Sequence, residues 1–165
     1  MTRGPSKDIT VCEETVVAEL LGRRPLGRFE VARRCANGAP AVIKNAPFLD
    51  DGSPMPTLYW LVEPTVRAEV SRIESRGGVR QAEAEVDPDA LAQAHHAYAA
   101  ARDALLEGHH VGPVPSGGVG GTRRGVKCLH AHLAFWLVGG ADPVGDWVSV
   151  RIPGLLEPMG LDRPR

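Results

Sequence analysis

The sequence predicts a single α+β domain, in which a small antiparallel sheet of about three strands packs with four to five helices. Strand-type alternation and a hairpin turn signal fall in the first part of the chain, whereas helical spacing with capping residues dominates the remainder. The 165 residues are 43% hydrophobic, which is enough for one core and too little for two full domains. We expect the domain to span residues 10–152, between a polar, flexible tail at 1–9 and an irregular, Pro-rich tail at 153–165.

The first helix and a β-hairpin are predicted from local spacing and turn residues. Apolar side chains recur at helical spacing over residues 10–21, and Gly22 can end that helix in a left-handed conformation. Two strands follow, at residues 29–35 and 41–44, and the Asn-Gly dipeptide between them is typical of a hairpin turn.

Alternation assigns the faces of the predicted sheet. In the first strand, Phe29, Val31 and Arg33 fall on one side, because successive side chains of a strand point to opposite faces. Residues 57–62 read TLYWLV, a run rich in aromatic and aliphatic side chains that predicts the third strand.

Helical signals fill the second half of the chain. The predicted helices cover residues 64–76, a stretch from Asp87-Pro88 to Gly108, residues 125–138 and a short segment from Asp142-Pro143. Asp followed by Pro marks a helix start, because Asp caps the free N–H groups and Pro suits the first turn. The segment over 125–138 is apolar nearly all round, so we expect it at the centre of the core.

Composition and charge exclude several classes of protein. The 19 basic and 20 acidic residues give a net charge of −1, which disfavours nucleic acid as a partner in the absence of a local basic patch. The three cysteines lie far apart, which fits a reducing compartment better than a disulfide framework. No apolar run reaches the roughly 20 residues of a membrane span, and the first residues hold no apolar signal core. We therefore expect a soluble, cytoplasmic protein with no membrane span.

The segment from Gly117 to Leu137 combines a glycine-rich loop, positive charge, a thiol and two histidines. Arg123, Arg124 and Lys127 lie at the start of the predicted core helix. Unpaired N–H groups at a helix N-terminus carry partial positive charge, and glycines let backbone approach a phosphate closely. This predicts a site for a phosphate-bearing or other anionic ligand, although the Walker-loop pattern is absent. The alternative is a solvated basic loop.

Cys128 and two histidines stand close together near the start of this helix. The neighbouring cations favour the reactive thiolate form of Cys128. His132, four residues on, shares the Cys128 face of a helix, whereas His130 is expected to point toward an apolar stripe. A Cys/His pair fits a nucleophile with its base, or half of a metal site with Cys35 as a third ligand. The alternative is that Cys128 is a small buried hydrophobe and His130 a core histidine bonded to the backbone.

Two further histidine pairs, at residues 95–96 and 109–110, carry no site prediction. Neighbours on a helix diverge by about 100°, so the first pair cannot readily act as one chelate. We expect all four to be surface or boundary residues.

Four motifs in order resemble a known family. They read RCANGAPAVIKNAP, LDDGSPMPTLYWL, GVKCLHAHLA and DPVGD, and the match runs from about Leu20 to about Val150. The chain resembles the bacterial domain-of-unknown-function family 501, which has no assigned activity to carry over. The matching residues are Arg34, Cys35, Gly38, Pro40, Gly52, Pro56, Thr57, Lys127, Cys128, Leu129, His130, Pro143 and Gly145. The resemblance implies a bacterial cytoplasmic protein, and family genes often neighbour those for a septum-formation protein and an exopolyphosphatase.

The chain departs from the family pattern at two places. The family often has a cysteine or histidine after the tyrosine-containing strand, but this chain reads Val62-Glu63-Pro64, so a metal ligand is lost there. Asp142 stands where the family usually has asparagine. Between the two helix histidines, the resemblance favours His130 as the functional one and helix geometry favours His132.

Three hypotheses of function come out of these residues. The leading hypothesis is a protein that binds a phosphate-type anion, with no cofactor identified. Its candidate ligand-binding residues are Arg123, Arg124, Lys127 and the family-matching Arg34, and its candidate catalytic residues are Cys128 and His130. The second is a non-enzymatic protein-partner module for cell division or envelope control, with an exposed apolar patch involving Tyr59, Trp60 or Trp147. The third is a Cys/His metal-binding protein.

Overall fold

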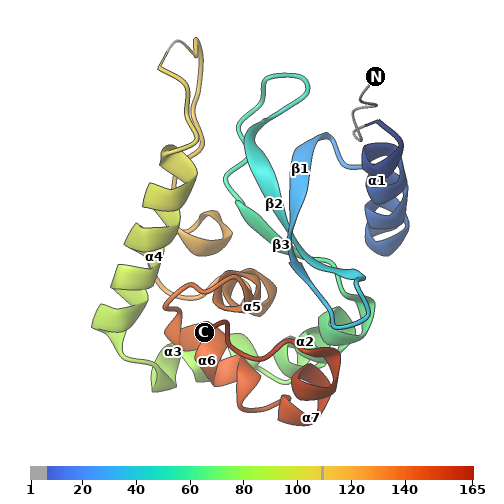
Figure 1. The fold of residues 1–165 in the computed structure, drawn as a ribbon. Coiled ribbons are helices and arrows are strands. Elements are labelled where there is room, and N and C mark those ends of the chain that lie inside the picture. The colour runs from blue at the N-terminus through green and yellow to red at the C-terminus, as the bar shows by residue number, and fades with distance from the viewer. Residues whose placement is uncertain (1–6, 109) are drawn as a thin grey trace.

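A computed structural model of the chain describes residues 7–108 and 110–165 (Figure 1). These residues form one three-stranded antiparallel sheet and seven α-helices, which confirms the predicted α+β class. The strands are β1 (Gly27–Arg34), β2 (Pro40–Leu49) and β3 (Tyr59–Leu61). The helices are α1 (Lys7–Leu21), α2 (Pro64–Ser75), α3 (Gly78–Glu85), α4 (Pro88–Asp103), α5 (Leu129–Leu137), α6 (Pro143–Ser149) and α7 (Pro153–Leu156). Two short 3₁₀ helices are η1 (Val119–Gly121) and η2 (Glu157–Met159). Residues 1–6 of the predicted N-terminal tail lie outside the described residues.

The sheet is covered on both faces. β2 is the central strand, with an antiparallel neighbour on each side. Successive side chains of a strand point to opposite faces, so Ile43 packs with Val17 of α1 while Val42 joins the core around α5. Figure 1 shows α1 on one side of the sheet and α5 on the other. One strand therefore supplies two separate apolar layers.

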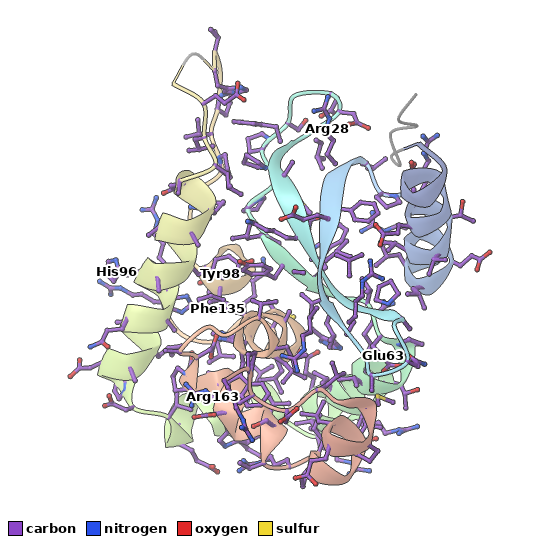
Figure 2. All side chains as sticks on the ribbon, viewed as in Figure 1. Arg28, Glu63, His96, Tyr98, Phe135 and Arg163 are labelled. Carbon is purple, nitrogen blue, oxygen red and sulfur yellow. The ribbon has the colours of Figure 1, made fainter. Side chains whose placement is uncertain are left out.

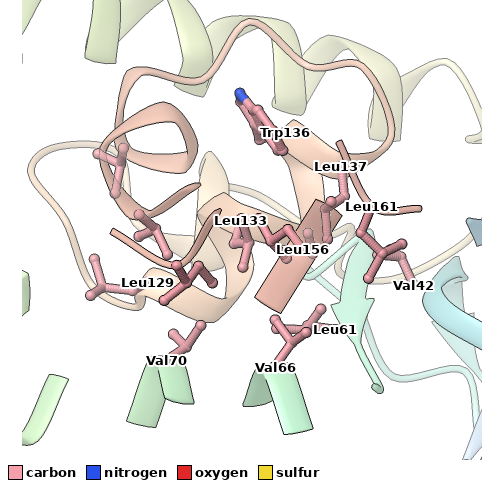
Figure 3. Close-up of a cluster of buried hydrophobic side chains, with 14 of the residues drawn as sticks. Val42, Leu61, Val66, Val70, Leu129, Leu133, Trp136, Leu137, Leu156 and Leu161 are labelled. Carbon is pink, nitrogen blue, oxygen red and sulfur yellow. The ribbon is translucent and has the colours of Figure 1, made fainter. Parts of the chain in front are cut away.

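Helix α5 is the centre of the main core, as its apolar sequence predicts. Eight of its nine residues are buried, and His130 is the one that is partly exposed. Figure 3 shows Leu129, Leu133 and Leu137 among side chains from β2, β3, α2 and the C-terminal segment. In the described part of the chain, no helix combines the length and the apolar character needed to cross a membrane.

Helix α5 begins at Leu129, not at the predicted residue 125. Gly125 has a φ of 64° and Cys128 has a φ of −151°, and neither value is helical. The Val126 N–H donates to a Glu83 carboxylate oxygen at 2.7 Å, so the loop is held by α3 up to this point. Cys128 is the N-cap residue of α5 and lies outside its regular turns.

Strand β1 carries a bulge that reverses the predicted side of Arg33. The pairing with β2 shifts between Val31 and Arg33, which adds residues to one strand only. Phe29 and Val31 therefore pack toward α1, whereas Arg33 reaches the opposite side and donates to the Leu137 carbonyl at 2.8 Å. Strict alternation predicts all three on one face, and the bulge makes that prediction wrong for Arg33.

Two helices are absent from the sequence prediction. Gly77, with a φ of 84°, ends α2 as predicted, but α3 begins at the very next residue. The segment predicted as an irregular tail at 153–165 contains α7 and η2. Leu156 and Leu161 of this segment are buried in the main core. Local sequence patterns do not predict that these leucines are buried. Because they are, the C-terminal segment is part of the folded domain.

The DPVGD motif is explained by packing between α5 and α6. The Asp142 carboxylate accepts hydrogen bonds from the N–H groups of Val144 and Gly145, which caps α6. A Cβ atom at Gly145 would lie 2.3 Å from the Trp136 Cβ atom and 2.9 Å from the His132 carbonyl oxygen. Only glycine allows this close approach of the two helices.

We expect Gly145→Ala to lower the free energy of unfolding by about 1–3 kcal/mol, because the added methyl group overpacks the α5–α6 contact. Urea unfolding at neutral pH measures the change. Gly154→Ala is the matched control, because a Cβ atom at Gly154 would meet nothing within 4 Å. Equal stability of the two variants would contradict the role given to Gly145.

Candidate functional site

A cavity of about 710 Å³ lies where β3, α2 and the loop before α5 meet. Its lining residues are Leu21, Arg23, Thr57, Tyr59, Trp60, Leu61, Pro64, Arg67, Ala68, Ser71, Gly120, Lys127, Cys128, His130 and Ala131. Three of the lining side chains are basic, and none of the described lining residues is acidic. The remaining walls are largely aromatic and aliphatic, so the cavity combines positive charge with apolar surface.

Cys128 and His130 come together at this cavity with a carboxylate from α2. The Cys128 Sγ atom lies 3.8 Å from His130 Nδ1, and a Glu74 carboxylate oxygen lies 3.3 Å from the same nitrogen. One ligand atom from each of the three residues lies within 4.8 Å of the others. A thiol, an imidazole and a carboxylate therefore converge on one point beside the cavity.

The second ring nitrogen of His130 is held by α2. Nε2 lies 3.1 Å from the Arg67 carbonyl oxygen and 3.2 Å from the Ser71 hydroxyl. A carbonyl oxygen can only accept, so Nε2 carries the hydrogen and Nδ1 is the nitrogen that faces Cys128 and Glu74. Burial alone lowers the pKa of His130, but the Cys128 sulfur, the Arg67 carbonyl and Glu74 together raise that pKa above its ordinary value.

Glu74 also satisfies the N-terminus of α5. Its carboxylate accepts a hydrogen bond of 2.7 Å from the Leu129 N–H, while Glu83 accepts one from the Val126 N–H. Two backbone N–H groups, one just before α5 and one at its first residue, are therefore already bonded to carboxylates of the chain itself. Sequence reasoning did not select Glu74, because no local signal in the predicted helix 64–76 links this residue to the loop.

The structure divides the candidate residues chosen from the sequence into two groups. Lys127, Cys128 and His130 line the cavity. Arg123 and Arg124 are exposed on the loop and are not among the lining residues.

Arg34 is the last residue of β1, next to the hairpin turn, and it does not line the cavity. Its guanidinium pairs with Glu13 and donates to the Gly38 carbonyl oxygen at 3.1 Å. Cys35 beside it is buried, and burial together with the charge of Glu63 raises the pKa of this thiol. Among the described residues, the potential ligand cluster consists of Glu74, Cys128 and His130 and does not include Cys35.

His132 does not face Cys128, contrary to the helical-spacing prediction. The i, i+4 relation holds only within a helix, and Cys128 lies outside α5. His132 is instead buried, with Nδ1 at 2.7 Å from the Asp142 carboxylate. His130 is the histidine that reaches Cys128, and the prediction that it points into the apolar stripe is wrong.

His95 fixes the glycine-rich loop to α4, so it is not a surface or boundary residue. Its side chain is buried; Nδ1 accepts from the Val119 N–H at 3.0 Å, and Nε2 lies 2.9 Å from the Gly125 carbonyl oxygen. A Cβ atom at Gly118 would lie 2.4 Å from His95 Nδ1, so the loop packs directly on the ring. Figure 2 shows the neighbouring His96 pointing away from the core.

The neutral form of His95 fits this environment, because Nδ1 must accept and Nε2 must donate. Desolvation lowers the pKa of His95, the Gly125 carbonyl opposes this, and the nearby His132 adds to the lowering. The unfolded chain, with a histidine pKa of about 6.5, then binds the proton more readily than the folded chain. This contribution to stability is complete above about pH 6.5 and is lost as the pH falls below that value.

We expect the change in the free energy of unfolding from about pH 7.5 to about pH 5.5 to be less destabilising in His95→Ala than in the parent protein, because the raised pKa of His130 contributes equally to both and only the parent has the lowered pKa of His95. The variant itself should be less stable by about 1–3 kcal/mol at the higher pH, because it leaves the buried Val119 N–H without an acceptor. Urea unfolding at both pH values provides the comparison. His96→Ala is the exposed control and should keep the parent slope; a parent slope in His95→Ala would refute the assignment.

The cluster at the cavity supports two kinds of chemistry. Transfer of the Cys128 proton to His130 Nδ1 gives a thiolate and an imidazolium, and the Glu74 carboxylate stabilises the positive ring. The same three side chains also provide sulfur, nitrogen and oxygen donors of the kind that bind transition metals. Of these three residues, Cys128 and His130 line the cavity.

Comparison with models of protein families identifies the family to which the chain belongs. The model of the family described as "Protein of unknown function (DUF501)" matches residues 31–150. The chain belongs to the DUF501 family. Comparisons of this DUF501 chain with curated proteins and with solved structures give no match.

The motifs that carry the DUF501 resemblance divide into structural and site positions. The Asn-Gly turn closes the β1–β2 hairpin, and the Asp-Pro-Val-Gly segment caps and packs α6. The KCLH motif instead supplies three of the side chains beside the cavity, from Lys127, Cys128 and His130. Its leucine, Leu129, is fully buried in the core and is the first residue of α5.

Proposed function

We propose that this DUF501 protein binds an anionic small molecule, of the phosphate-bearing class, in the cavity between β3, α2 and the loop before α5. One observation carries the proposal: basic side chains of Arg23, Arg67 and Lys127 line the cavity, with no acidic residue among the described lining residues. A volume of about 710 Å³ falls in the range of small-molecule sites. Arginine and lysine are the side chains that most often bind phosphate groups in proteins.

Two of the three basic side chains are oriented by contacts at the edge of the cavity. The Arg23 guanidinium carbon lies 5.4 Å from the centre of the Trp60 ring, a cation–π distance. One Arg67 nitrogen donates to the Leu20 carbonyl oxygen at 2.8 Å. Lys127 approaches from the loop on the other side and is exposed to solvent. The charge is therefore supplied from three separate segments of the chain.

The walls suit a ligand that carries an apolar or aromatic part beside its charged group. Tyr59, Trp60 and Leu61 of β3 are among the lining residues. Cys128 and His130 also line the cavity, and we propose them as the reactive residues if the bound molecule is turned over. Arg123, Arg124 and Arg34 stay predictions as ligand-binding residues, because their side chains lie outside the lining.

The partner-module hypothesis has less support than the anion site, because the three aromatic side chains predicted to form an exposed apolar patch are not fully exposed. Trp147 is buried, donates to a Glu85 carboxylate oxygen at 2.6 Å and is covered by the Arg151 guanidinium. Tyr59 and Trp60 are only partly exposed, and both line the cavity. A role in cell division or envelope control therefore stays a prediction of the family resemblance.

Thermal unfolding with inorganic phosphate, pyrophosphate, a nucleoside triphosphate and sulfate tests the anion site. A ligand at 100 times its Kd stabilises the folded protein by about 2.7 kcal/mol, which raises the Tm measurably. We expect stabilisation by at least one phosphate compound at concentrations where sulfate has no effect. Absence of a shift with every compound, in metal-free and in Zn²⁺-supplemented buffer, would overturn the proposal.

Variants locate the site. Lys127→Ala and Arg23→Ala should each raise the Kd of the stabilising compound by about 10- to 100-fold, since each removes a charged hydrogen bond of about 1.5–3 kcal/mol. Calorimetric titration measures this change. Arg80→Ala, which removes an exposed arginine outside the lining, is the matched control and should leave the Kd unchanged. A loss of binding in Arg124→Ala with none in Lys127→Ala would place the anion on the loop surface instead.

A further inference from the structure

We propose that Glu74, Cys128 and His130 form a zinc site with three protein ligands and a fourth position open to the cavity. Cys128 comes from the loop before α5, and His130 comes from the first turn of that helix. The carboxylate of Glu74 comes from the last turn of α2. The proposal goes beyond anion binding, because Zn²⁺ can occupy these ligands with or without a molecule in the cavity.

The distances between the ligand atoms fit one tetrahedral ion. Zinc binds sulfur, nitrogen and oxygen ligands at about 2.0–2.3 Å, so two ligand atoms of a tetrahedral site lie about 3.3–3.6 Å apart. His130 Nδ1 lies 3.3 Å from the Glu74 oxygen and 3.8 Å from Cys128 Sγ. All three ligand atoms lie within 4.8 Å of one another. Side-chain rotation of Cys128 and Glu74 would bring the third pair, Sγ and the carboxylate oxygen, from within 4.8 Å to the tetrahedral separation.

The direction of approach separates a metal site from a catalytic triad. In a triad, the nucleophile and the acid contact different nitrogens of the histidine. Here Cys128 and Glu74 both face Nδ1 of His130, and that nitrogen can donate at most one hydrogen. The single lone pair or hydrogen of Nδ1 therefore serves one of these two neighbours at a time, whereas one cation placed among the three atoms binds all of them.

The outer contacts are those of a metal ligand. A histidine that binds a metal through one nitrogen usually donates the other N–H to a carbonyl or carboxylate. His130 Nε2 faces the Arg67 carbonyl oxygen at 3.1 Å, and the Glu74 carboxylate is fixed by the Leu129 N–H at 2.7 Å. Both ligands are therefore oriented before an ion arrives, one by α2 and the other by the start of α5.

The donor set identifies the kind of ion. Calcium and magnesium prefer oxygen ligands only, whereas a thiolate with an imidazole and a carboxylate suits Zn²⁺. The thiolate of Cys128 and the carboxylate of Glu74 offset the two positive charges of the ion, which is necessary beside Lys127. Cys128 and His130 line the cavity, so a water molecule or an anion can reach the fourth position, as in catalytic zinc sites.

Zinc binding by the whole chain, without any phosphate compound, tests the inference. Metal-free protein is titrated with Zn²⁺ against a competing chromophoric chelator, and with Co²⁺ to look for the sulfur-to-cobalt charge-transfer band. We expect one Zn²⁺ per chain and a Co²⁺ band that disappears in Cys128→Ser. Absence of stoichiometric zinc binding would overturn the proposal and leave the anion site untouched.

Conservative variants separate ligands from structural residues. Cys128→Ser, His130→Asn and Glu74→Gln should each weaken zinc binding by more than the roughly 10- to 100-fold that loss of an outer partner costs. Glu74→Gln keeps an oxygen acceptor for the Leu129 N–H, so its fold, checked by circular dichroism and urea unfolding, should persist. Cys35→Ser and His96→Ala are the matched controls and should keep full affinity. Undiminished binding in Glu74→Gln or His130→Asn, or loss in Cys35→Ser, would refute the ligand set.

Discussion

The burial of α5 is the constraint on which the rest of the structure depends. An apolar helix of nine residues is stable in water only if other elements enclose it on every side. The sheet covers one side through Val42 and Leu61, α2 and α6 cover others, and Leu156 and Leu161 close the C-terminal side (Figure 3). His130 is the one α5 residue that this enclosure leaves partly exposed. The helix that organises the core therefore also presents its one partly exposed side chain to the cavity.

A buried helix also needs partners for the backbone groups at its two ends. At the N-terminus the Leu129 N–H donates to Glu74, and at the C-terminus the Leu137 carbonyl accepts from Arg33. Both partners come from distant parts of the chain, and Arg33 also holds the carbonyl oxygens of Gly160 and Asp162. Glu74 thus serves the helix end and the Cys/His pair at once, so the cluster is a consequence of capping the core helix.

The glycine-rich loop has a defined conformation because α4 holds it. His95 and Arg102 are both buried; His95 contacts the backbone of Val119 and Gly125, and Arg102 donates to the Gly117 carbonyl oxygen at 2.7 Å. Several loop amides are already paired within the chain, which leaves side chains rather than backbone N–H groups to receive a ligand. The proposed anion site therefore depends on the side chains that line the cavity, where Lys127 and two arginines come from separate segments.

The sequence by itself determined the α+β class, the presence of three strands in the first part of the chain, the hairpin turn and the central place of the segment that forms α5. These features depend on periods of 2 and 3.6 residues and on capping and turn residues, which act over a few positions. The sequence also predicted site roles for Lys127, Cys128 and His130, which line the cavity. Only the tertiary structure decided that α5 begins after Cys128, that a bulge turns Arg33 toward α5, and that His130 rather than His132 meets the thiol. Glu74 lies 55 residues from Leu129, and no local pattern encodes a contact over that separation; packing of α2 against α5 creates it.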